Sequence, residues 1–97
     1  MTFTITNTMY AKNMDPNTLA TRAAAVALDF DSLDWLGISL DTDTTSEHAS
    51  GLVQRVVVLA SSGAGPVPDA EIPNYLAGGI FANTLEQALS VPVTSVP

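Results

Sequence analysis

Four side chains that could hold a cation or transfer a proton lie close together near the middle of the sequence. The stretch SLDTDTTSEHAS, residues 39–50, contains Asp41, Asp43, Glu47 and His48, the single histidine of the chain. On an extended backbone the carboxylates of Asp41 and Asp43 would share one side, about 6–7 Å apart, which suits a hard cation such as Ca²⁺. The stretch lacks the spacing and the distal glutamate of calcium-binding loops. We therefore predict no metal site and interpret the stretch as an acidic loop.

A catalytic role for His48 would require a nucleophile and an orienting carboxylate nearby in the fold. None of the nearby serines stands in the Gly-x-Ser-x-Gly pattern of a nucleophile elbow: Ser46, Ser50, Ser61 and Ser62. The chain has no cysteine, which excludes disulfides and thiolate zinc sites. We therefore expect no catalytic residue and a protein that is not an enzyme.

A second motif, Gly63-Ala64-Gly65-Pro66, resembles half of a phosphate-binding loop. It lacks the following Lys-Ser/Thr pair, and Pro66 stands where a helix should begin to offer N–H groups. The surrounding chain is also acidic, which disfavours a bound phosphate. We therefore predict no cofactor.

The charge of the chain is strongly unbalanced. Ten acidic residues stand against three basic ones, for a net charge of −7. Six of the acids lie between Arg22 and Arg55 with no base among them: Asp29, Asp31, Asp34, Asp41, Asp43 and Glu47. Direct contact with nucleic acid or with an anionic membrane is disfavoured, because both need clustered Lys and Arg. Three interpretations of this charge stay open: a basic partner, a cation, or solubility alone.

Alternation and capping predict the elements of the first half. Period-2 alternation predicts a strand over residues 2–10, with Phe3, Ile5 and Met9 on one face and threonines on the other. Asp15-Pro16 is typical of a helix start, so we expect a helix over 16–30. A second strand should contain Ile38 and end at Leu40.

The second half is less regular. Residues 52–60, LVQRVVVLA, favour a strand because β-branched residues dominate, although Thr44-x-x-Glu47 matches a capping box that would start a helix instead. Residues 69–90 predict a helix with Gly78-Gly79 inside its apolar stripe. Glycine is unfavourable in a helix by about 1 kcal/mol relative to Ala, so we expect close packing around Gly78, Gly79, Phe81 and Ala82.

These elements predict an α+β domain over residues 1–90, in the order β-α-β-β-α. A small, mostly antiparallel sheet of about three strands would carry two helices on one face, and residues 91–97 would form an extended, proline-containing tail. No apolar run reaches the roughly 20 residues of a membrane span. No basic segment precedes an apolar one at the N-terminus either, so we expect synthesis in the cytoplasm.

Two functions fit this description. The first is a small acidic assembly protein that associates with itself or decorates a larger particle, such as a virus or phage particle. Its interface would contain the glycine pair with Phe81 and Ala82. The alternative is an acidic binding or inhibitory protein, such as a nucleic-acid mimic, that occupies a basic surface of a partner through Asp41, Asp43 and Glu47.

Overall fold

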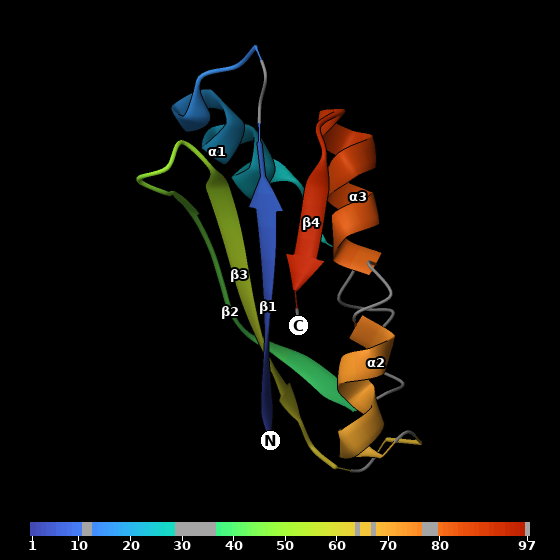
Figure 1. Cartoon of the computed structure of the whole chain (residues 1–97). Coiled ribbons are helices and arrows are strands. Elements are labelled where there is room, and N and C mark those ends of the chain that lie inside the picture. The colour runs from blue at the N-terminus through green and yellow to red at the C-terminus, as the bar shows by residue number, and fades with distance from the viewer. Residues whose placement is uncertain (11–12, 29–36, 64, 67, 77–79, 97) are drawn as a thin grey trace.

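The computed structural model shows two layers, with helices packed on one face of a single antiparallel sheet (Figure 1). It describes residues 1–10, 13–28, 37–63, 65–66, 68–76 and 80–96. In this part of the chain the sheet has four strands in the order β2-β3-β1-β4. The predicted α+β class with helices and an antiparallel sheet is confirmed, whereas the predicted number of strands is wrong.

The described elements follow one another as β1 (Thr2–Met9), α1 (Pro16–Ala25), β2 (Ile38–Glu47), β3 (Val53–Ser61), the 3₁₀ turn η2 (Asp69–Glu71), α2 (Ile72–Leu76), α3 (Ile80–Leu89) and β4 (Val93–Val96). The first strand of the sequence therefore lies in the interior of the sheet, between β3 and β4. Among the described residues no helix is long and apolar enough to cross a membrane.

The core lies between the sheet and the helices. Alternate residues of β1 and β3 are buried there, for β1 as the alternation of the sequence predicted, and Ile5 pairs directly with Val57. Leu19 of α1 and Leu85 of α3 are also fully buried and belong to the same cluster. Burial of such a side chain stabilises the fold by about 1.5–3 kcal/mol.

The acidic stretch is a strand and not a loop. The prediction that the second strand ends at Leu40 is wrong, because β2 continues in register with β3 as far as Glu47. A β-bulge between Leu40 and Thr42 marks the only irregularity in that described pairing. The capping box at Thr44 is likewise not used, because Thr44 and Glu47 have extended backbone. Residues 53–61 form the strand that the β-branched residues favoured.

The helices are shorter than predicted. Helix α1 begins as expected, with the Asp15 side chain accepting from the Thr18 N–H, but it ends at Ala25 because Val26 is extended. Residues 29–30 of the predicted helix lie outside the described residues. The segment predicted as one helix over 69–90 contains η2, α2 and α3, and residues 77–79 lie outside the described part of the chain.

The predicted C-terminal tail contains a strand. Residues Val93–Val96 form β4, which pairs antiparallel with β1 at the edge of the sheet. Pro92 precedes this strand, and proline is tolerated at such an edge because an outward-facing N–H is not needed for the sheet. The extended conformation was therefore predicted correctly, but its place in the sheet was not.

Candidate functional site

One buried charge organises the junction of β2, β3 and α1. The Arg55 residue is only 4% exposed and lies on the helix-covered face of β3. Its Nε and Nη2 atoms donate to the two carboxylate oxygens of Asp43 at 2.9 and 2.8 Å. Its Nη1 atom donates to the carbonyl oxygens of Ala23 and Val26 at 2.8 and 2.7 Å.

These contacts give Arg55 and Asp43 a structural role in the fold. The guanidinium satisfies carbonyls at the C-terminal end of α1, where a cation also complements the helix dipole. Both Asp43 oxygens accept from the same guanidinium in a bidentate pair, which is the strongest common geometry for this interaction. Asp43 is therefore occupied by an internal partner, and the sequence did not predict that partner because it lies in another strand.

The other two acids of β2 are separate from this pair. Asp41 and Glu47 are exposed and stand on either side of Asp43 along the strand. No group of three or more possible metal ligands occurs among the residues that the structure describes. Asp41 and Glu47 therefore give the exposed strand β2 an acidic character.

His48 lies at the exposed tip of the hairpin that joins β2 to β3. Its Nδ1 atom is 3.0 Å from the Ser50 hydroxyl and accepts from the Ser50 N–H at 3.4 Å. Gly51 completes the turn with a positive φ of 83°, which glycine adopts readily. Both contacts are local to the turn, and no carboxylate within the described ranges is bonded to the imidazole.

The motif that begins at Gly63 also has local contacts. The Gly63 N–H donates to the Ser61 hydroxyl at 3.2 Å, and that hydroxyl donates to Asp69 at 2.6 Å. These bonds tie the end of β3 to η2. The Gly63 N–H is thus already hydrogen-bonded within its own exposed loop, and Ala64 lies outside the described residues.

The residues predicted to form a close-packed interface divide into two groups. Phe81 and Ala82 are 2% and 7% exposed and belong to the core of their own chain. Gly78 and Gly79 lie outside the described residues. Internal packing therefore accounts for Phe81 and Ala82 without a second subunit.

Asn7 is a buried polar residue that the sequence analysis did not select. It is 0% exposed, and neither polar atom of its side chain has a hydrogen-bond partner in the described structure. It lies on the covered face of β1, directly opposite Arg55 of β3. The sequence contained a signal for both residues, because each interrupts an apolar alternation at an inward position.

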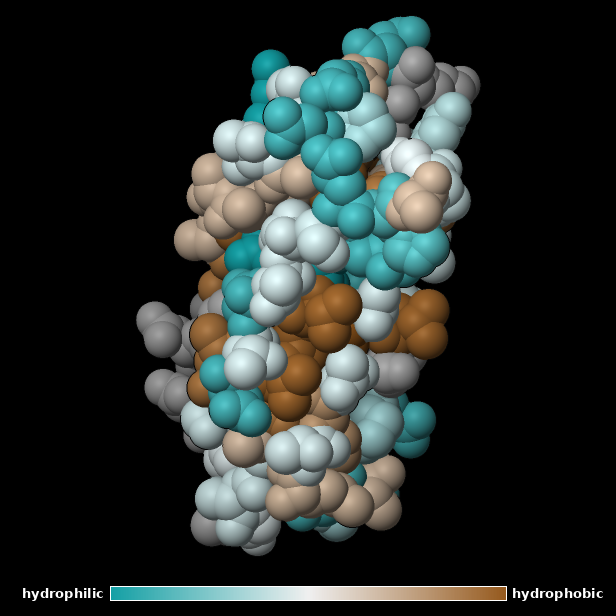
Figure 2. All heavy atoms as spheres, turned by 90° about the vertical axis from the view of Figure 1, so that its left-hand side faces the viewer, coloured by the Kyte–Doolittle hydropathy of each residue, from teal (hydrophilic) through white to brown (hydrophobic). Residues whose placement is uncertain are grey.

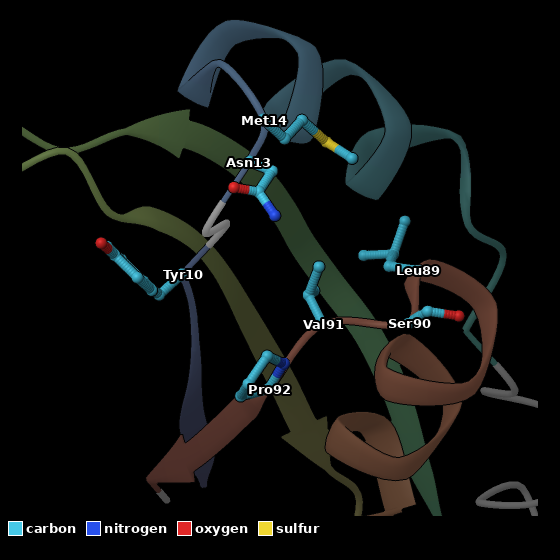
Figure 3. A pocket seen from close by; sticks show the side chains of 7 residues that line it. All are labelled: Tyr10, Asn13, Met14, Leu89, Ser90, Val91 and Pro92. Carbon is cyan, nitrogen blue, oxygen red and sulfur yellow. The ribbon is translucent and has the colours of Figure 1, made fainter.

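A shallow hollow of about 340 Å³ lies where β1, α1, α3 and β4 approach one another (Figure 3). The side chains of Met14, Leu89 and Val91 gather on one side of it, and Tyr10 reaches away. No charged residue lines the hollow among the described residues. It therefore offers space for an apolar group beside the polar side chains of Tyr10, Asn13 and Ser90.

The face of the sheet opposite the helices carries no formal charge at its regularly paired positions. We call it the open face and define it by the outward residues of the strands: Thr2, Thr4, Thr6, Thr8, Ser39, Thr42, Thr44, Ser46, Gln54, Val56, Val58, Ala60, Thr94 and Val96. Figure 2 is viewed from the side away from α2 and α3. Around the middle of the molecule it shows hydrophobic atoms next to atoms of intermediate hydropathy. No described helix covers this face (Figure 1).

The open face combines two chemical features. Val56 and Val58 follow the centre of the sheet, where a solvated face would ordinarily carry polar side chains. The threonines of β1 lie beside them, and each adds a methyl group and a hydroxyl. The open face thus combines exposed methyl groups with neutral hydroxyls and has no charge at its paired positions.

Comparison with known proteins adds no family to this description. No protein-family model, no curated protein and no solved structure matches the chain.

Proposed function

We propose that the protein is an assembly module that associates with itself through the open face. The observation that carries this proposal is the distribution of charge. The chain has a net charge of −7, yet the regularly paired positions of the open face are all uncharged. Such a module would form a homo-oligomer or contribute to a larger particle.

Two copies of a strongly acidic protein repel each other, and the repulsion is weakest when the surfaces that meet are free of charge. The open face meets this condition and also presents Val56, Val58 and Val96, the last of which is 57% exposed. Face-to-face packing would bury these valines between two sheets. Sheets pack in this way about 10 Å apart in β-sandwiches.

The size of the face sets the strength of association that we expect. Strands spaced by about 4.8 Å and about 27 Å long give a face on the order of 500 Å² in each copy. Two copies would bury on the order of 1,000 Å², close to the lower limit of about 1,200 Å² for stable interfaces. We therefore expect an association that depends on protein concentration.

The test introduces one carboxylate into the middle of the open face. Thr4 is exposed and lies beside Val58 on the open face. In a dimer of the Thr4→Glu variant, each copy would therefore carry one new carboxylate into the contact. Light scattering or sedimentation over a range of concentrations should show dimers or larger species for the wild type. The Thr4→Glu variant should remain a monomer at the same concentrations.

Gln87→Glu is the matched control, because Gln87 is exposed on α3, away from the open face. It adds the same charge and should associate as the wild type does. Added salt should strengthen the association of the wild type, because it screens repulsion between acidic chains. A wild type that stays monomeric at millimolar concentration, or equal association of the Thr4→Glu variant, would contradict the proposal.

A further inference from the structure

The two edges of the sheet are closed to different extents. At the β4 edge, the N–H of Val93 donates to Oε1 of Glu86 at 2.9 Å, so a side chain of α3 already occupies an outward donor. Pro92 precedes this short strand and offers no N–H. The β2 edge is longer, and no described strand pairs with its outer side.

The hairpin contacts identify which backbone groups of β2 point outward. The His48 N–H donates to the Leu52 carbonyl at 2.7 Å, so residues 48 and 52 form a hydrogen-bonded pair. Bonded and non-bonded pairs alternate along an antiparallel ladder, so the next bonded pairs contain Ser46 and Thr44. The N–H and C=O groups of Asp43, Thr45 and Glu47 consequently point away from β3.

A contact at the other side of β3 agrees with this assignment. The Ser61 N–H donates to the Met1 carbonyl at 2.8 Å, so odd-numbered residues of β3 bond to β1. Even-numbered residues of β3 then bond to β2, as the hairpin contact requires. The outer edge of β2 thus presents a row of backbone donors and acceptors to solvent, which is the template that an added strand uses.

From this edge we infer that β2 binds an extended, basic segment of a partner protein by strand addition. Charge selects this occupant over a second copy of the chain. Pairing two β2 strands would bring Asp41 and Glu47 of one copy close to the same residues of the other, and like charges on adjacent strands are destabilising. Asp41 and Glu47 are both exposed and stand outside the Arg55–Asp43 pair, so they can meet lysine or arginine.

The edge also provides an apolar contact for the added strand. The Leu40 side chain lies near the start of β2 and is 44% exposed. Side chains on one face of a strand recur every second residue, about 6.8 Å apart. The segment that fits best therefore alternates basic residues with small residues and places one apolar residue beside Leu40. This inference concerns the edge and does not depend on association through the open face.

The test uses a capped eight-residue peptide in which lysine and threonine alternate. We expect it to bind the wild-type protein in a fluorescence anisotropy titration and to bind more weakly as salt is added. On binding, hydrogen exchange measured by NMR should slow at the amides of Asp43, Thr45 and Glu47. The amides of Thr44 and Ser46 already bond within the sheet and should change less.

Two control peptides separate charge from strand pairing. A glutamine-threonine peptide keeps the length without the charge and should bind about tenfold more weakly, given the usual strength of exposed ion pairs. A lysine-threonine peptide with alternate N-methyl groups keeps the charge but lacks the donors for one side. It should lose at least about tenfold in affinity, because several hydrogen bonds disappear.

A pair of protein variants tests the place of binding. Glu47→Gln should weaken binding of the lysine peptide, whereas Glu71→Gln removes the same charge from η2 and should leave it unchanged. Equal binding of the N-methylated peptide, or of the neutral peptide, would overturn the inference. So would protection of the Asp43, Thr45 and Glu47 amides that rises with protein concentration alone, because a second copy would then occupy the edge.

Discussion

Val57 and Val58 are neighbours in β3, yet they have opposite environments. Val57 is 0% exposed against the helices, whereas Val58 lies on the open face beside Thr4. The covered face contains the polar groups that are difficult to bury, Arg55 and Asn7, while the open face has no charge at its paired positions. Between these two faces the position of formal charge is thus the reverse of a simple rule in which charges lie outside, although the core around Arg55 is apolar.

This reversal has a physical reason on each face. Arg55 is tolerated on the covered face because all of its contacts are supplied by Asp43 and by α1. The open face lacks charge at its paired positions although water could solvate charge there, and its polar groups are neutral hydroxyls and one amide. The difference between the faces is what a contact with another copy would require.

The largest expected effect tests the covered face. Arg55→Ala should destabilise the protein by about 3–5 kcal/mol, because it leaves Asp43 and the Val26 carbonyl without their donor and removes one of the two donors to the Ala23 carbonyl. Arg22→Ala is the matched control, since Arg22 is exposed in the last turn of α1, and it should cost at most about 1 kcal/mol. Urea unfolding followed by circular dichroism measures both. Equal losses would show that the buried arginine has no special role.

A smaller effect compares the two faces at adjacent positions. Val57→Thr buries a hydroxyl and should cost about 1–3 kcal/mol, whereas Val58→Thr should stay within about 0.5 kcal/mol in dilute protein. The same unfolding measurement at low concentration checks the difference. If both substitutions cost the same, the face opposite the helices is covered as well as the inner one.

The smallest expected effect concerns Asn7. Asn7→Val should stabilise the protein by about 1 kcal/mol, because it removes two buried polar atoms that have no partner in the described structure. Thr6→Val, one residue away on the open face, is its control and should stay within about 0.5 kcal/mol. A loss of stability for Asn7→Val in thermal unfolding would show that Asn7 has a binding partner in solution.

The sequence predicted β1 and β3 as strands, found only the beginning of β2 and did not predict β4 as a strand. The residues of β1 alternate because one side is covered, whereas β3 was predicted from its β-branched residues, which continue from Val56 to Val58. β2 lacks this signal beyond Ile38, because most of its residues are exposed on both faces. Its strand conformation comes from hydrogen bonds to β3, which depend on a register that composition does not encode.

The candidate surfaces were predictable only in part. Asp41, Asp43 and Glu47 stood out by charge, but Asp43 could not be separated from the other two without knowing that Arg55 lies beside it. The glycine pair suggested an interface, whereas the open face depends on four strands that are distant in sequence. Surfaces made by a sheet cannot be read from any one of its strands.

The position of β1 has a consequence for how the chain reaches its fold. β1 precedes the other described strands of the sheet, yet both of its neighbours, β3 and β4, come much later in the sequence. Contacts between distant segments slow folding, because the loop between them must close first. Among the described strand pairs, only the β2–β3 hairpin can form locally, so β1 has to wait for that hairpin before it can pair. During that interval its apolar residues are unprotected, and aggregation competes with folding at this step.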